Sequence, residues 1–300
     1  MTEIRMLWLE TGDLYTIRRG VEAGVQRGYY VDHLEVLDLR FEATGGGSCV
    51  TGPGGNLLNL YDALIIRSFM PWLAESLTLA KLFASAGKVV CDHALVDEGY
   101  AMSKMHDYVV LAASSVDVPN TFHCFDAWQA EAASEVLGFP CILKGIHGSE
   151  GRHVHRIDTR EQFRKRLGQY RGGELMVQEY LDARSDYRVI CVGFKSLPLV
   201  VERTPRQGEF RTNFEYQEIV TALPAAEVPE IVALAERAAS VLRREFTAVD
   251  IRCRGMKPLI LEANRRPGFK GFEEATHYDV AGQLIDYVAD RVRQNKGGLS

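Results

Sequence analysis

The first hundred residues alternate between short apolar runs and longer stretches with helical spacing. Ile4 to Leu9 and Ala63 to Ile66 are apolar runs of strand length. Residues 13–27 and 72–86 instead place apolar side chains every three or four positions, and a glycine follows each stretch, as it often does at a helix end. Because strands that alternate with helices form parallel sheets, the pattern predicts an α/β domain over residues 1–98.

The pattern changes after about residue 100. Residues 174–211 read almost entirely as strands, and further strands are expected up to residue 263. The helices predicted at 228–244 and 279–293 are grouped apart from these strands. Runs of strands with separate helices are typical of α+β proteins, so we expect a second architecture after residue 98.

Charge and cysteine content exclude several classes of protein. The chain has 35 Lys and Arg against 40 Asp and Glu, a formal charge of −5, which gives no electrostatic reason to bind nucleic acid. No apolar run approaches the roughly 18 residues that span a bilayer, and the N-terminus lacks a signal-peptide pattern. The six cysteines include no C-x-x-C pair, which is typical of reduced thiols. We therefore expect a cytoplasmic protein without nucleic-acid or membrane partners.

Two glycine-rich stretches have different predicted roles. Residues 45–55 predict a turn region. Gly148, Ser149 and Gly151 follow a predicted strand that ends in Lys144, and the backbone N–H groups of such a loop can approach phosphate oxygens beside a lysine charge. This loop is not a Walker A motif, which ends in Gly-Lys-Ser/Thr. A hairpin turn with a surface lysine remains the alternative.

Three oxygen-bearing side chains stand near the ends of two neighbouring predicted strands. They are Asp250, Glu262 and Asn264. Glu262 and Asn264 are two positions apart, so they share one face of their strand. Carboxylate and amide oxygens suit Mg²⁺, and acidic residues on otherwise apolar strands need a partner. The alternative is a solvent-facing strand edge.

Arginines recur in the strand-rich part of the chain, at Arg188, Arg203 and Arg211. Taken singly, each is explained by a surface charge. His153 and His155 would share a strand face, but two histidines without a third ligand make a poor zinc site.

Together these segments follow the order of motifs of one known family. The matching segments are Ser103-Lys104, Val118 to Thr121, Lys144 with Gly148 to Gly151, Gln178 to Leu181, Asp186-Tyr187-Arg188, Glu202-Arg203, Gly208 to Asn213, Val249-Asp250-Ile251, Leu261 to Asn264 and Pro267-Gly268. In this order they resemble the RimK-type ATP-grasp ligases, the family of ribosomal-protein glutamate ligases. The resemblance covers roughly residues 88–290, and residues 1–98 look like the family's preATP-grasp domain. It implies an ATP-grasp domain with a small lid over residues 99–178 and a larger strand-rich half over residues 179–300.

The resemblance also implies a site for ATP and for two Mg²⁺ ions, which Mn²⁺ could replace. Lys104 and Lys144 would hold the phosphates, and the Gly148 to Gly151 loop would close over them. The implied hinge against the adenine consists of Glu179, Tyr180 and Leu181. Asp186 would face the ribose.

The remaining implied roles concern the reaction itself. The metal ligands would be Asp250, Glu262 and Asn264, with Glu262 bridging the ions. Arg211 and Asn213 would line the reacting phosphate, and Arg203 joins Arg211 as a candidate catalytic residue. In this family ATP phosphorylates a carboxylate, and an amine then displaces the phosphate to form an amide.

The sequence departs from the family pattern near the expected acceptor site. Arg265 and Arg266 stand where the family has small residues between the metal-binding Asn and the Pro, and residues 214–217 replace the usual Gly-Gly pair. We expect Arg265, Arg266 and Arg188 as candidate contacts for an anionic substrate, because arginine matches carboxylates with paired donors.

We therefore expect a ligase that joins an amino acid or small amine to a carboxylate, on a small molecule or a peptide, in a chain that could form a homo-oligomer. Two alternatives remain open. One is an ATP-grasp ligase that closes ester or amide links in a peptide. The other is a nucleotide-binding protein that has lost catalysis.

Overall fold

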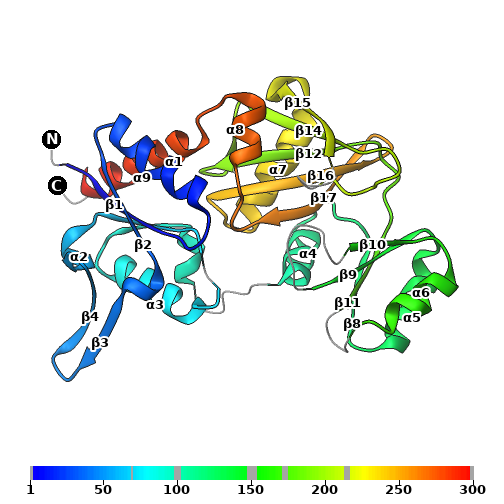
Figure 1. Ribbon diagram of the computed structural model, residues 1–300, viewed down its shortest axis with the longest axis horizontal. Coiled ribbons are helices and arrows are strands. Elements are labelled where there is room, and N and C mark those ends of the chain that lie inside the picture. The colour runs from blue at the N-terminus through cyan, green and yellow to red at the C-terminus, as the bar shows by residue number, and fades with distance from the viewer. Residues whose placement is uncertain are drawn as a thin grey trace.

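The computed structural model describes residues 3–68, 70–97, 103–146, 154–170, 175–212 and 217–297 of the chain. Figure 1 shows an N-terminal sheet beside both chain ends, a central strand-rich part, and a smaller sheet at the far end of the molecule. Within the described ranges, no helix is long and apolar enough to cross a membrane.

The N-terminal sheet is parallel, which confirms the α/β prediction. Its strands lie in the order β2-β1-β6-β7. Their bounds are β1 (Arg5–Leu9), β2 (Tyr30–Leu34), β6 (Ala63–Ile66) and β7 (Val89–Cys91). Successive residues of β1 point to opposite faces: Trp8 packs in one core cluster and Leu7 in the other. Helices α1 (Leu14–Gln26) and α3 (Leu73–Ser85) complete these two layers.

The glycine-rich stretch turns the chain at residues 45–46 and 53–54, as predicted, but the prediction missed the short strands that these turns connect. It forms a three-stranded antiparallel sheet of β3 (Arg40–Thr44), β4 (Gly47–Gly52) and β5 (Gly55–Asn56), followed by α2 (Leu57–Leu60). Gly47 and Gly55 take positive φ angles of 133° and 113°, which side-chain-bearing residues rarely adopt. The glycines therefore turn the chain between short strands, and the buried Val50 fixes β4 against the core.

The small sheet at the far end is the lid. It is antiparallel with the order β10-β9-β11-β8. The bounds are β8 (Thr121–Cys124), β9 (Cys141–Gly145), β10 (Val154–Ile157), β11 (Leu175–Glu179), α5 (Ala127–Leu137) and α6 (Arg160–Leu167). Leu143 and Val177 pack with Phe163 of α6 in the lid core, which leaves the other face of the sheet to meet the central part.

The central sheet is antiparallel, with the order β15-β14-β12-β16-β17 and β13 beside β12. The bounds are β12 (Asp186–Val192), β13 (Lys195–Ser196), β14 (Leu199–Pro205), β15 (Gln217–Pro224), β16 (Phe246–Arg254) and β17 (Lys257–Asn264). Its helices are α4 (Lys104–Ala113), α7 (Pro229–Val241) and α8 (Lys270–Thr276). Three short 3-10 helices span Val36–Asp38, His93–Val96 and Ala225–Glu227. The lid and the strand-rich sheet together confirm the α+β expectation.

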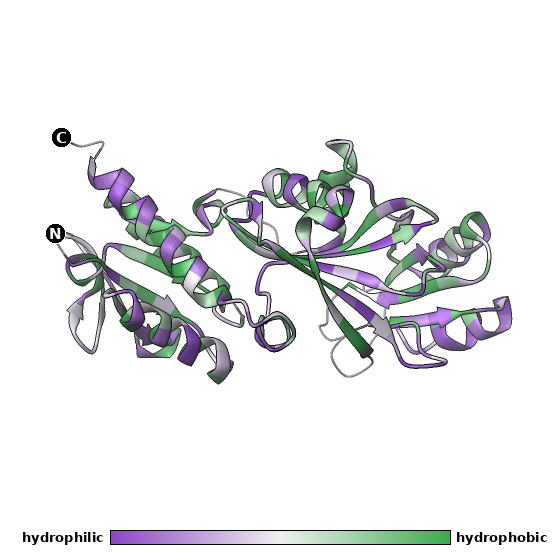
Figure 2. Cartoon of the chain, turned by 90° about the horizontal axis from the view of Figure 1, so that it is seen from above, coloured by the Kyte–Doolittle hydropathy of each residue, from purple (hydrophilic) through white to green (hydrophobic). Residues whose placement is uncertain are grey.

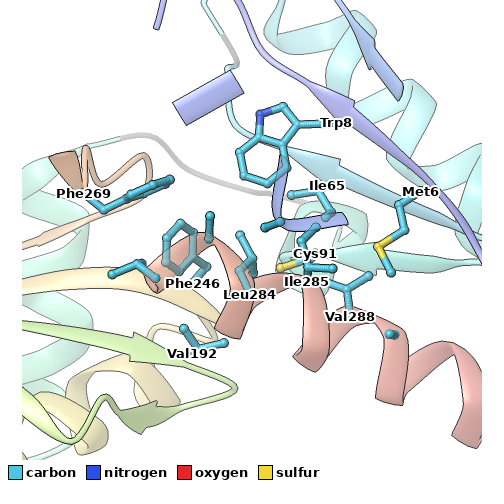
Figure 3. Packing of buried hydrophobic residues seen from close by; sticks show 14 of the residues in the cluster. Met6, Trp8, Ile65, Cys91, Val192, Phe246, Phe269, Leu284, Ile285 and Val288 are labelled. Atoms are coloured by element: carbon cyan, nitrogen blue, oxygen red, sulfur yellow. The ribbon is translucent and has the colours of Figure 1, made fainter. Parts of the chain in front are cut away.

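The last helix, α9 (Val280–Gly297), returns to the N-terminal sheet and packs against α1. Arg27, directly after α1, donates to Asp286 at 2.8 Å and to Asp279 at 2.9 Å. Figure 3 shows Trp8 from the N-terminal sheet, Phe246 from the central sheet and Leu284 from α9 in one apolar cluster. Figure 2 shows hydrophilic and hydrophobic residues alternating along α9, as expected for a helix with one buried side. The N-terminal and central sheets therefore share a core, whereas the domain boundaries at residues 98 and 178 stay predictions.

Candidate functional site

A cleft of about 830 Å³, including space open to solvent, lies between the lid and the central sheet. Ten of the residues singled out from the sequence line it: Lys104, Lys144, Glu179, Tyr180, Leu181, Asp186, Arg203, Arg211, Asp250 and Glu262. Gly148, Ser149, Gly151 and Asn213 lie outside the described residues, as does His153. Gln178, Phe210, Thr212 and Leu261 also line the cleft; they lie in segments that match the family but were given no role of their own. The remaining lining residues, Ile142, Val154 and Arg252, were not anticipated.

Lys144 is buried near the end of β9, which excludes the alternative of a surface lysine. Its ammonium donates to the Tyr108 hydroxyl and to Gln178 Oε1, each at 3.0 Å. Burial lowers the pKa of Lys144 to about 8, although the Glu262 carboxylate opposes this shift. A buried cation held by two neutral oxygens is suited to receive an anion from the cleft.

Side chains of helix α4 contact both Lys144 of the lid and residues of β17. Lys104, at its first turn, lies 3.4 Å from Glu262 Oε1. Tyr108 follows one helical turn later and donates its hydroxyl hydrogen to the Leu261 carbonyl while accepting from Lys144. The i, i+4 spacing was a signal in the sequence that could have singled out Tyr108 beside Lys104.

Two aspartates and two arginines form a network of ion pairs at the cleft, in which Arg188 is half-buried and the other three are buried. Arg188 donates to both oxygens of Asp250 at 2.8 Å, and Arg203 Nη2 reaches Asp250 at 3.0 Å. Arg203 also donates to both oxygens of Asp186, at 2.8 and 2.9 Å, and the Thr212 hydroxyl donates to Asp186 as well. Burial disfavours a charged Asp250, but the Arg188 and Arg203 guanidiniums outweigh it and lower its pKa to about 2. Asp250 is therefore held ionised.

The expected metal ligands gather at one end of this network. Asn264 Nδ2 lies 3.3 Å from Asp250 Oδ2, and Asp250 is the cross-strand partner of Glu262. The register then shifts, because β17 carries Leu261 as an extra residue opposite β16. This bulge explains how two consecutive residues, Leu261 and Glu262, both face the cleft. Asp250 is buried, so a solvent-facing edge does not describe it, and three oxygen donors fit Mg²⁺.

Another acidic cluster lies away from the cleft. Among the described residues, Cys91, Asp92 and Glu245 bring their side chains within metal-ligand reach of one another. Asp92 accepts from the Phe246 N–H at 2.8 Å, and Glu245 from the His93 N–H at 2.7 Å. These contacts join β7 to β16, so we assign the cluster a structural role.

Residues of the expected hinge, and Arg211 at the expected phosphate side, form further contacts. Glu179 contacts Arg254 and accepts from Asn120 at 3.0 Å. The Arg156 guanidinium lies 4.4 Å from the ring centre of Tyr180. Arg211 Nη2 binds Glu209 at 2.7 Å, beside the cleft.

Arg265 and Arg266 do not line the cleft. Arg265 lies 2.6 Å from Asp107 of α4, and Arg266 lies 3.1 Å from the buried Glu10 at the end of β1. Arg266 also donates to the Thr11 carbonyl at 2.7 Å. Carboxylates of the chain itself therefore engage both arginines, and their substrate role stays a prediction, as does that of Arg188.

Comparisons with known proteins show the family. The family model described as the RimK-like ATP-grasp domain matches residues 101–288, so the chain belongs to the RimK-like ATP-grasp family, and it is an enzyme of the ligase class. A probable alpha-L-glutamate ligase of Serratia proteamaculans is 29% identical, and the match covers 94% of each chain. A ribosomal protein bS6–L-glutamate ligase of Escherichia coli O7:K1 is 27% identical over 92% of each.

Solved structures show the same fold. The ATP-grasp ligase PsnB, complexed with minimal precursor, Mg and ADP, has a TM-score of 0.74 at 17% identity, covering 97% of this chain and 99% of that one. A RimK domain ATP-grasp protein from Sphaerobacter thermophilus has a TM-score of 0.66 at 22% identity, covering 95% and 99%.

Proposed function

We propose that this chain is an ATP- and Mg²⁺-dependent ligase that forms an amide bond between a carboxylate and an amine through an acyl-phosphate. The observation that carries the proposal is that Lys104 and Lys144 line the same cleft as Asp250 and Glu262. Two cations would meet the phosphates, and oxygen ligands would meet the metal. The family match and the names of the relatives support the same chemistry.

The chain's residues would act on a phosphoryl group that passes from ATP to a carboxylate oxygen, with ADP leaving. Lys144 and Lys104 would hold the phosphate oxygens and offset their charge. Asp250, Glu262 and Asn264 would hold Mg²⁺, which neutralises charge on the phosphates when bound. The buried Arg203 would hold the Asp186 and Asp250 carboxylates in place.

The second half of the reaction would convert the acyl-phosphate to an amide. An amine attacks the carbonyl carbon, inorganic phosphate leaves, and the amine nitrogen loses a proton to solvent or to phosphate. The relatives named for glutamate ligation favour an amino acid as one substrate. The other would be a small molecule or peptide, since solved neighbours are complexed with precursor peptides.

An ADP-release assay across pairs of amino acids, and of amino acids with peptides, tests this proposal. We expect ADP to form only when a carboxylate and an amine substrate are both present. Glu262→Ala should abolish turnover at saturating Mg²⁺ without loss of folding. Lys195→Met, which removes an exposed lysine paired with Glu236, is the control and should leave turnover unchanged.

The assay also separates the alternatives. ADP release that requires a peptide carrying both reacting groups would identify a macrocyclising ligase. Nucleotide binding without ADP release for any pair would identify a catalytically silent protein and contradict the proposal.

A further inference from the structure

Arg252 is a buried guanidinium on the floor of the cleft. It lies in β16 and is only 6% exposed. Its Nη2 donates to the Phe210 carbonyl at 2.8 Å, but its buried Nε has no acceptor. Among the described residues, no carboxylate forms an ion pair with it, in contrast to Arg188 and Arg203 beside it. A desolvated charge with one carbonyl contact is unfavourable unless something else in the cleft interacts with it.

Its position on β16 places Arg252 between the two ends of the cleft. Residues two apart on a strand share a face and lie about 6.7 Å apart. Asp250, at the expected metal end, therefore precedes Arg252 by one such step, and Arg254 follows it by another. Arg254 contacts Glu179 at the expected hinge. A ligand that reaches from the hinge to the metal must pass over Arg252.

Apolar side chains line the cleft from both sides, among polar ones such as Gln178 and Asp186. Ile142 and Val154 come from the lid, whereas Leu261, Phe210 and Leu181 come from the central part and the hinge. Side chains that line both sides of a cleft in this way are suited to a planar ring. A guanidinium is itself planar and binds the faces of aromatic rings by stacking and by cation–π attraction.

We propose that Arg252 is a specificity-determining residue whose guanidinium lies against the face of the nucleotide base and favours a purine. A purine offers two fused rings to this plane, and a pyrimidine offers one. The inference rests on the proposed function, because it requires that the cleft hold a nucleotide. It goes beyond the proposed function because it assigns the preference for a purine base to Arg252.

Calorimetric titration with ADP and with UDP, each with Mg²⁺, tests the proposal. We expect the wild-type chain to bind ADP more tightly. Arg252→Met keeps the length of the side chain and removes the charged plane, so it should weaken ADP binding roughly three- to thirty-fold. It should weaken UDP binding less. The dissociation constant of UDP divided by that of ADP should therefore fall at least about threefold.

Arg237→Met is the matched control. Arg237 also donates Nη2 to one carbonyl, that of Ser114 at 2.8 Å, but it lies exposed on α7 away from the cleft. Both dissociation constants should stay unchanged in this variant. Arg252→Lys retains a charge but loses the planar guanidinium, so it should also lower the ratio of the UDP to the ADP dissociation constant. It replaces Arg252→Met as the test if the methionine variant does not fold.

The outcomes distinguish this inference from the proposed function. Equal losses for ADP and UDP would place Arg252 on the ribose or the phosphates and overturn the base contact, and unchanged binding of both would overturn it too. Either result leaves the proposed function standing, because the wild-type chain still binds ADP. Failure of the wild-type chain to bind any nucleotide would overturn both.

Discussion

Nucleotide affinity should fall as pH rises through 8, because Lys144 must be charged to bind phosphate. Burial lowers the pKa of Lys144 to about 8, so the free enzyme loses this proton between about pH 7 and 9. Bound phosphate would favour the ammonium and raise its pKa again. Binding above pH 8 is therefore coupled to the uptake of a proton by Lys144. The free energy of this protonation makes the apparent affinity weaker.

The magnitude follows from the pKa. If the bound lysine stays protonated up to pH 9, the apparent dissociation constant scales as one plus ten to the power (pH − 8). It then rises about tenfold between pH 7 and 9, or roughly 1.4 kcal/mol. Phosphate groups, with a second pKa near ~6, contribute little over this range.

Calorimetry with ADP at several pH values measures this dependence. Repeating the titration at pH 8 in buffers of different ionisation enthalpy should reveal the uptake of about half a proton. Lys144→Arg keeps its charge throughout this range, so its affinity should be flat with pH. A wild-type dissociation constant that does not change between pH 7 and 9 would refute the assignment of Lys144 as a phosphate contact with a lowered pKa.

Three further predictions concern residues around the cleft and the shared core. Tyr108→Phe removes one acceptor of Lys144 and should weaken ADP binding about three- to tenfold by calorimetry. In a Lys144→Met background, Tyr108→Phe should cause no further loss of ADP affinity. The control Tyr61→Phe, which loses a hydroxyl bonded to Asp32, should leave ADP binding unchanged. Arg266→Ala should lower the melting temperature, because Glu10 loses its cation, and an unchanged KM for the carboxylate substrate in this variant would contradict the substrate role of Arg266. Burial, together with the charge of Glu245, raises the pKa of Asp92 to about 7, so the stability that a protonated Asp92 provides is present below about pH 4 and lost as pH rises through 7. Asp92→Asn should therefore melt at a higher temperature than wild type at pH 8 and at a similar temperature at pH 4. A wild type that melts at the same temperature as the variant at pH 8, or at a higher one, would contradict this.

Much of the candidate site could be predicted from the sequence, because its residues sit at fixed places on local elements. Lys144 lies near the end of a short apolar strand, and Glu262 and Asn264 stand two positions apart on one strand, so period-two alternation was enough to predict that these two share a face. The alternation of strands and helices likewise determined the parallel sheet. The missed residue Arg252 shares its face with Asp250, but an arginine in a strand gives no local sign of whether it is buried.

What the sequence determined by itself is therefore most of the elements, without the short strands β3, β4 and β5, together with the fold class and the family. Only the tertiary structure decided which charges meet. Arg266 and Glu10 are 256 positions apart, and Arg265 and Asp107 are 158 apart, so no local pattern pairs them. The bulge that turns both Leu261 and Glu262 into the cleft depends on how β17 pairs with β16. The physical reason is that hydrophobic periodicity specifies each element from its own residues, whereas the partner of a buried charge depends on which elements pack together.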